Sequence, residues 1–166
     1  MFLRGVNVGG IKVESAKLRQ VLTGLGLTDV TTYLASGNVT FGSDAAPATL
    51  TADVERALSD AFHYDAHVLV FRRSTLAAVV TGYPFAHDPG HHRYAVFCDS
   101  PATAADLAGA GGAEEVSADG PVVYWRCPRG STLATPFAKV LARRAYQAVT
   151  TTRNLNTVEK MVAPPA

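Results

Sequence analysis

Three short segments interrupt the apolar core pattern with polar side chains, and two of them contain glycine. They are residues 3–10 (Leu-Arg-Gly-Val-Asn-Val-Gly-Gly), residues 36–38 (Ser-Gly-Asn) and residues 153–156 (Arg-Asn-Leu-Asn). Glycine allows close approach to the backbone, exposed backbone N–H groups can form an anion-binding concavity, and arginine adds charge and paired donors. The sequence therefore predicts a polar anion site built from Arg4, Asn7, Gly9, Gly10, Ser36, Asn38, Arg153, Asn154 and Asn156.

The same segments have a purely structural interpretation, which the sequence favours over ligand binding. The glycines would form a tight connection between a strand and a helix, and the asparagines would hydrogen-bond the local backbone. A nucleotide-binding P-loop is excluded, because Ile11 stands where its lysine is required and Lys12 comes one residue late. The three-glycine dinucleotide pattern is absent as well, which leaves a generic anion nest.

Histidines and cysteines give no catalytic or metal site by their spacing. Four potential metal ligands share residues 87–92, but the pair Pro89-Gly90 argues against the helix that would align them. We therefore predict a solvated loop and no metal. Neither Cys98 nor Cys127 lies at the start of a helix beside a basic group, where a thiol becomes a nucleophile. No catalytic residue and no cofactor is predicted.

Composition indicates an ordinary globular protein in a reducing compartment. Hydrophobic residues make up 48% and charged residues 17% of the 166-residue chain, which suits one domain or two small subdomains. Both cysteines lie in apolar runs and are interpreted as buried free thiols, with a bridged pair left open. No apolar run reaches the ~18–20 residues of a membrane span, and no secretory signal is visible. We expect a cytoplasmic protein without a membrane partner.

The net charge of +1 hides an uneven distribution. Residues 126–160 carry seven basic side chains against the single acid Glu159, whereas residues 44–65 carry five acids against Arg56. Such a separation can create a positive face for an anionic partner. The more common origin of such a pattern, solvated helix surfaces, carries the greater weight.

Hydrophobic periodicity predicts a β-α-β-β-α-β order for the first half of the chain. Strands are expected at residues 1–6, 30–34, 39–41 and 66–71, and helices at 16–25 and 50–62. Ser15 is the expected cap of the first helix, and Leu25 is expected on its buried face.

The second half repeats this order after a connecting helix at residues 74–81. Strands are expected at 94–98, 114–117, 122–126 and 148–151, and helices at 102–110 and 133–144, followed by a C-terminal helix. Leu133 is expected on the buried face of the helix that it opens. Asn156 and Glu159 resemble a capping box at the start of the C-terminal helix.

This order predicts an α+β fold of two tandem ferredoxin-like (βαββαβ) subdomains packed as one unit, plus a C-terminal helix. The expected division is 1–73 for the first subdomain, 74–93 for the connecting helix and loop, 94–152 for the second subdomain and 153–166 for the C-terminal helix and tail. Aromatic residues on such sheets can stack RNA bases. The accompanying sequence signature is missing, so these aromatics are interpreted as core.

The octet at residues 3–10 resembles the opening signature of the bacterial domain-of-unknown-function family 1697. Residues 36–39 (Ser-Gly-Asn-Val) and 152–158 (Thr-Arg-Asn-Leu-Asn-Thr-Val) match further motifs of that family in the same order, so the resemblance spans nearly the whole chain. It implies an α+β fold with duplicated ferredoxin-like halves and implies no activity. Members usually have several residues before the Leu-Arg-Gly triplet, which implies a late start at Met1 and a clipped first strand.

The leading functional hypothesis is a cytosolic binding protein for an anionic ligand, either a phosphorylated small molecule or a nucleic-acid backbone. One alternative is an enzyme that acts on a phosphorylated metabolite or nucleotide at the same residues, by electrostatic stabilisation. The other is a structural protein–protein interaction module that pairs through an exposed sheet edge.

Overall fold

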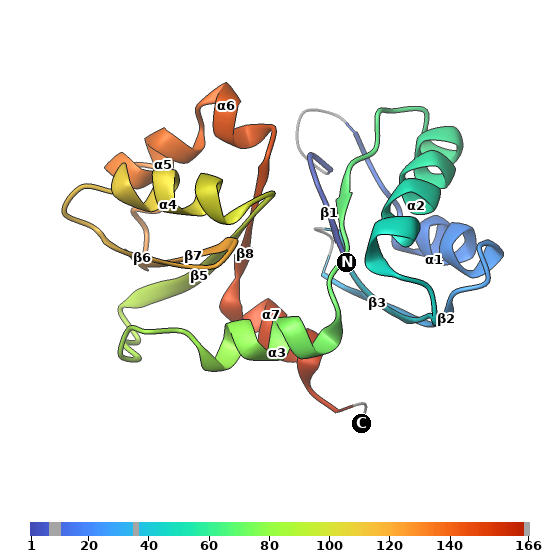
Figure 1. Cartoon of the computed structure of the whole chain (residues 1–166), viewed down its shortest axis with the longest axis horizontal. Coiled ribbons are helices and arrows are strands. Elements are labelled where there is room, and N and C mark those ends of the chain that lie inside the picture. The colour runs from blue at the N-terminus through green and yellow to red at the C-terminus, as the bar shows by residue number, and fades with distance from the viewer. Residues whose placement is uncertain (7–10, 35–36, 165–166) are drawn as a thin grey trace. The chain divides into compact units, whose positions relative to one another are not determined.

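The computed structural model describes residues 1–6, 11–34 and 37–164 (Figure 1). The chain divides into two compact units, Met1–Thr75 and Leu76–Ala166. Within the described residues it is an α+β protein with two four-stranded antiparallel sheets, one in each unit. The helix α3 (Arg73–Thr81) contains the boundary between the units.

The first unit has the strand order β2-β3-β1-β4 in its sheet. Its elements are β1 (Phe2–Leu3), α1 (Ser15–Gly24), β2 (Thr28–Tyr33), β3 (Asn38–Gly42), α2 (Pro47–Phe62) and β4 (Val68–Leu69). The helices bury the residues that recur at helical spacing, Leu18 and Leu22 on α1 and Leu50, Val54 and Leu58 on α2. These side chains and the strand residues Leu3, Val39 and Val68 form one core.

The second unit has the equivalent order β6-β7-β5-β8. Its elements after α3 are β5 (His91–Cys98), α4 (Pro101–Gly109), β6 (Glu115–Asp119), β7 (Val122–Pro128), α5 (Pro136–Leu141), α6 (Arg144–Gln147), β8 (Thr150–Asn154) and α7 (Leu155–Val162). Alternate residues of β5 and β7 pack with α4 and α5 in one core, which includes Val96, Trp125 and Phe137. The intervening residues therefore project from the opposite face of the sheet, and α7 contacts β5 and β8.

Two strands of the first unit are shorter than predicted. The expected strands at 1–6 and 66–71 are the two-residue strands β1 and β4. Gly5 adopts a φ of +65°, which takes the chain out of the extended conformation just after Leu3. The expected burial of Leu25 is also wrong, because this side chain follows the end of α1 and is 40% exposed.

The predicted helix at 133–144 is instead two short helices, α5 and α6. Thr135 accepts a hydrogen bond from the backbone N–H of Ala138, and Pro136 occupies the first helical position, where a missing N–H costs nothing. The extended backbone of Arg143 separates α5 from α6. Leu133 therefore lies outside both helices and is 92% exposed, not buried as expected.

The predicted caps of two helices are also corrected. Glu14 is the residue before α1, without a side-chain cap bond, and Ser15 is already helical. The cap of α7 is Asn154, whose side chain accepts from the backbone N–H of Asn156. Among the described residues, none of the helices combines the length and apolar character that a membrane span requires.

Candidate functional site

The predicted site residues divide between the two units. Asn7, Gly9, Gly10 and Ser36 lie outside the described residues. Arg4 and Asn38 belong to the first unit, and Arg153, Asn154 and Asn156 belong to the second. Each set is therefore described within its own unit.

In the first unit, Gly37 and Asn38 form hydrogen bonds with neighbouring strands of the sheet. Asn38 is 1% exposed, and its Nδ2 donates to the carbonyl oxygen of Tyr33 at 3.1 Å across the hairpin. Gly37 has a φ of +72° and accepts a hydrogen bond from the backbone N–H of Leu3 at 2.7 Å. Just after β1, the backbone N–H of Arg4 donates to the carbonyl oxygen of His67 at 2.9 Å. In the described part of the first unit, these residues therefore form local hydrogen bonds to the backbone, as the structural interpretation of the motifs predicts.

In the second unit, the predicted segment runs from β8 into α7. Arg153 lies opposite Ala95 of β5, and burial lowers the pKa of its guanidinium to about 10. The Asn154 side chain accepts from the Asn156 backbone N–H at 3.0 Å and so caps α7. The Asn156 side chain is exposed, and its Oδ1 accepts from Nη2 of Arg93 at 2.7 Å. This last bond connects the predicted segment to β5.

Arg93 belongs to a row of four charged side chains, three on neighbouring strands and one on α7. We name it the arginine row: Glu115, Arg126, Arg93 and Glu159. Arg93 of β5 is directly opposite Arg126 of β7, and Arg126 is directly opposite Glu115 of β6. Arg126 pairs with Glu115 through Nε, and Arg93 pairs with Glu159 of α7 through Nη2 at 3.0 Å. The two cations therefore occupy the middle of the row and the two carboxylates its ends.

Both arginines are largely buried, with side chains that are 22% exposed for Arg93 and 19% exposed for Arg126. Like charges directly opposite in an antiparallel pair destabilise a sheet, by roughly 0.2–1 kcal/mol. Each guanidinium carries five N–H donors. The bonds of Arg93 to described residues all use Nη2, and those of Arg126 use Nε and Nη1. Donors therefore remain on both side chains for a further acceptor.

Tyr83 lies beside the arginine row. Its ring centroid is 5.9 Å from Cζ of Arg93, and its ring packs edge-on against Tyr124 of β7 at 5.8 Å. Burial raises the pKa of Tyr83 to about 12, although Arg93 and Arg126 act in the opposite direction. The buried hydroxyl has no hydrogen-bond partner among the described residues. It stays protonated at neutral pH and is a donor next to two cations.

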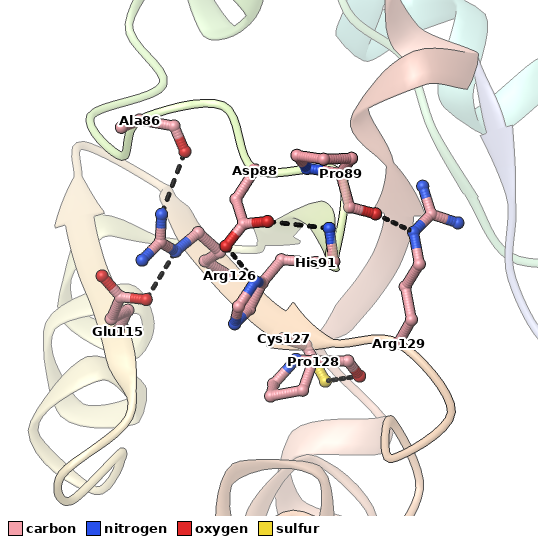
Figure 2. Close-up of polar contacts among 10 residues, drawn as sticks. Ala86, Asp88, Pro89, His91, Glu115, Arg126, Cys127, Pro128 and Arg129 are labelled. Carbon is pink, nitrogen blue, oxygen red and sulfur yellow. Dashed lines mark hydrogen bonds and ion pairs between the residues drawn. The ribbon is translucent and has the colours of Figure 1, made fainter.

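The loop that leads into β5 contacts Arg126 of the arginine row, as Figure 2 shows. Arg126 Nη1 donates to the carbonyl oxygen of Ala86 at 3.0 Å, and Arg129 Nε donates to that of Pro89 at 2.6 Å. Asp88 Oδ1 accepts from the backbone N–H of Gly90 at 2.7 Å, the bond that contributes most to lowering the pKa of this carboxyl. The loop predicted to be solvated is therefore fixed by side chains of β7 and of the turn that follows it.

Asp88 also contacts a histidine in this loop. Its Oδ2 lies 2.7 Å from Nδ1 of His91, and the two side chains are 40% and 26% exposed. Within the described residues, His, Cys, Asp and Glu form no group of three or more that could hold a metal ion.

The two cysteines are free and buried, as predicted. Burial raises the pKa of Cys98 to about 12 and also raises that of Cys127, with a smaller opposing effect of the Thr132 hydrogen bond. Both thiols are therefore protonated at neutral pH, which agrees with the absence of a nucleophile pattern in the sequence.

Sequence reasoning missed Arg93 and Arg126. A signal was available in part, because each arginine has the strand parity opposite to the core residues Val96 and Trp125. That parity places both on the face away from α4 and α5. Only the register of β5 against β7 places them directly opposite each other.

Comparison with solved structures identifies a similar fold. A conserved bacterial protein from Streptococcus pneumoniae superposes with a TM-score of 0.74 and 24% sequence identity, over 97% of this chain and 93% of that one. At this identity the similarity concerns the fold alone. A comparison with curated proteins gave no match. The family described as "Protein of unknown function (DUF1697)" matches residues 1–124, which confirms the resemblance, and the chain belongs to this family.

Proposed function

We propose that this protein binds an anionic ligand through the arginine row of its second unit. The ligand is a phosphorylated small molecule or a nucleic-acid backbone, both of which present phosphate oxygens. The observation that carries the proposal is the pair Arg93 and Arg126, two largely buried cations directly opposite each other on adjacent strands. Planar guanidinium groups match phosphate geometry better than any other side chain.

The charges of the row support this assignment. Glu115 and Glu159 balance the two arginines from the outer ends, so the row is neutral in sum but positive at its centre. A phosphate that accepts from the remaining donors of both arginines would relieve their mutual repulsion. Hydrogen bonds to charged groups contribute roughly 1.5–3 kcal/mol each, so one contact from each arginine would contribute roughly 3–6 kcal/mol to binding.

The proposal keeps part of the site predicted from sequence. Asn156 orients Arg93 through its hydrogen bond, Asn154 orients Asn156 by capping α7, and Arg153 adds a buried positive charge on β8. The loop at residues 7–10 and Ser36 stay predictions, as does a ligand role for Arg4. For Asn38 we propose a structural role, supported by its burial and its bond to Tyr33.

We also propose that each unit is a ferredoxin-like subdomain within the predicted boundaries. The equivalent strand orders β2-β3-β1-β4 and β6-β7-β5-β8 support this proposal, together with a helix after the first and the third strand of each unit. The two free thiols support the expected cytoplasmic location.

Binding by three arginine variants tests the function. Inorganic phosphate, pyrophosphate, adenosine monophosphate and a single-stranded RNA oligonucleotide serve as probes in calorimetric titrations at fixed salt. We expect Arg93→Gln and Arg126→Gln to weaken the probe that binds by roughly 10-fold or more, because each removes a charge-assisted hydrogen bond. Arg144→Gln on α6 removes the same charge from an exposed position and is expected to leave affinity within about two-fold.

Two results would contradict the proposal. One is equal weakening by all three variants, which would indicate binding to net charge alone. The other is the absence of binding by every probe, which would favour the protein–protein interaction module. Far-UV circular dichroism and Trp125 fluorescence verify that each variant is folded, because Trp125 is buried in the second core.

A further inference from the structure

A histidine beside the arginine row is arranged for proton transfer. His91 Nδ1 lies 2.7 Å from Oδ2 of Asp88 and is buried, whereas the side chain as a whole is 26% exposed. Nε2 forms no hydrogen bond with the residues that the structure describes. Nδ1 has this close contact with the carboxylate but no hydrogen-bond partner among the described residues. The negative charge beside Nδ1 favours a proton on that nitrogen, which leaves Nε2 as the basic atom.

Asp88 is itself fixed by the backbone. Its other oxygen accepts from the N–H of Gly90 at 2.7 Å, and the N–H of His91 donates to its main-chain carbonyl at 3.1 Å. Figure 2 shows the carboxylate between the turn and the imidazole. A carboxylate held by the backbone and facing a histidine is the arrangement that orients general bases in hydrolytic enzymes.

His91 also has the strand parity of the arginine row. His91 and Arg93 are two residues apart on β5, so their side chains share one face and their Cα atoms are roughly 6.6 Å apart. Arg126 of β7 contributes to lowering the pKa of Asp88, which places it within electrostatic range of the Asp88–His91 pair. The imidazole and the two guanidinium groups therefore belong to one surface.

We propose that His91 transfers protons in the hydrolysis of a phosphate ester whose phosphoryl group binds between Arg93 and Arg126, with Asp88 as the positioning residue. This inference rests on the proposed anion site. It develops the alternative hypothesis of an enzyme that acts on a phosphorylated compound. The proposed base lies in residues 87–92, which the sequence analysis interpreted as a solvated loop.

The chemical step uses water as its only co-reactant. A water molecule gives a proton to Nε2 of His91 while its oxygen forms a bond to phosphorus, and the bond between phosphorus and the alcohol oxygen breaks. The alcohol oxygen leaves on the side of phosphorus opposite the attacking water and takes a proton from solvent, and Nε2 returns its own proton to solvent. The products are an alcohol and inorganic phosphate, or an alcohol and a phosphate monoester where the substrate is a diester, and His91 is neutral again. Arg93 and Arg126 stabilise the negative charge on the phosphoryl oxygens in the transition state.

The test compares three variants of the full chain on two substrates, p-nitrophenyl phosphate and bis(p-nitrophenyl) phosphate. The wild-type chain is expected to release p-nitrophenolate from one of them. His91→Asn should lower kcat by roughly 100-fold or more, the usual contribution of a general base. His87→Asn, in the same loop and exposed, serves as the control and should leave kcat unchanged.

Asp88→Asn tests positioning through the split between kcat and KM. The neutral amide cannot hold a proton on Nδ1 as a carboxylate does, so kcat should fall by roughly 10-fold or more while KM changes little. A side chain that only supports the loop would change the yield of folded protein and leave kcat per folded molecule unchanged.

Failure of this inference is distinguishable from failure of the proposed function. Binding of inorganic phosphate that depends on Arg93 and Arg126, without turnover of either substrate, would overturn the role of His91 and leave the anion site standing. Turnover that persists in His91→Asn would overturn it equally. The absence of both binding and turnover would overturn both proposals.

Discussion

Gly37 decides between a structural and a ligand-binding interpretation of the Ser-Gly-Asn segment, and Gly37→Ala tests this directly. A Cβ at this position would lie 2.7 Å from Cβ of Leu3 and 2.9 Å from Cγ2 of Val6, both in the core of the first unit. The backbone φ of +72° adds strain for any residue with a side chain. The variant must therefore move β1 or leave the left-handed conformation.

The expected cost has two parts. A left-handed φ costs an alanine about 1–2 kcal/mol, and overpacking a core costs about 1–3 kcal/mol, so the free energy of unfolding should fall by roughly 2–5 kcal/mol. Gly5→Ala is the matched control, because Gly5 has a similar φ of +65° but no atom within 4 Å of its Cβ position. It should lose only the first part.

Urea unfolding followed by far-UV circular dichroism measures both variants. The two variants differ by the overpacking part of about 1–3 kcal/mol, so with a slope of about 1–3 kcal/mol per M we expect Gly37→Ala to unfold roughly 0.3–3 M earlier in urea than Gly5→Ala. Trp125 is in the second unit and reports that unit separately by fluorescence. Equal midpoints for the two variants would refute the packing argument, and Gly37 would then be free to approach a ligand.

Two further predictions concern buried polar groups of the second unit. Because burial holds the pKa of Cys98 near 12 and raises that of Cys127, an aromatic disulfide reagent should modify both thiols only after unfolding. In urea, the rate of thiol modification should rise between pH 7 and pH 9, whereas in the native protein it should stay low. Rapid modification of the native protein would contradict the burial of the two cysteines. Tyr83→Phe removes a buried hydroxyl that has no hydrogen-bond partner among the described residues. The free energy of unfolding, followed by Trp125 fluorescence, should therefore stay constant or rise by about 1 kcal/mol. A fall in the free energy of unfolding by more than about 1 kcal/mol would show that the hydroxyl is hydrogen-bonded.

The sequence predicted which elements the chain has better than where they begin and end. Helical spacing identified the buried faces of α1 and α2, because Leu22 and Val54 follow the apolar period. The errors came from local chemistry that outweighs periodicity. Pro136 starts a helix that apolar spacing would begin at Leu133, and Gly5 ends a strand that apolar residues would continue.

The candidate site was less predictable, because it depends on pairing between strands. The sequence motif identifies Asn156 as a candidate site residue. It does not predict the contact of Asn156 with Arg93, because 63 residues separate the two in the chain. An arginine at the polar end of a strand is ordinary in sequence. It becomes notable only when the register places Arg126 opposite it.

This difference explains why the motifs and the proposed site overlap so little. Glycine and asparagine attract notice in an apolar strand pattern because the backbone there needs a left-handed turn or a cap, and Gly37, Asn38 and Asn154 meet such needs. A binding surface needs instead that charges from distant segments converge, which leaves no local mark. Asn156 belongs to both groups, since its backbone N–H completes the α7 cap and its side chain orients Arg93. We therefore expect further ligand contacts to be found among the sheet neighbours of Asn156 and Arg93 sooner than within the motifs themselves.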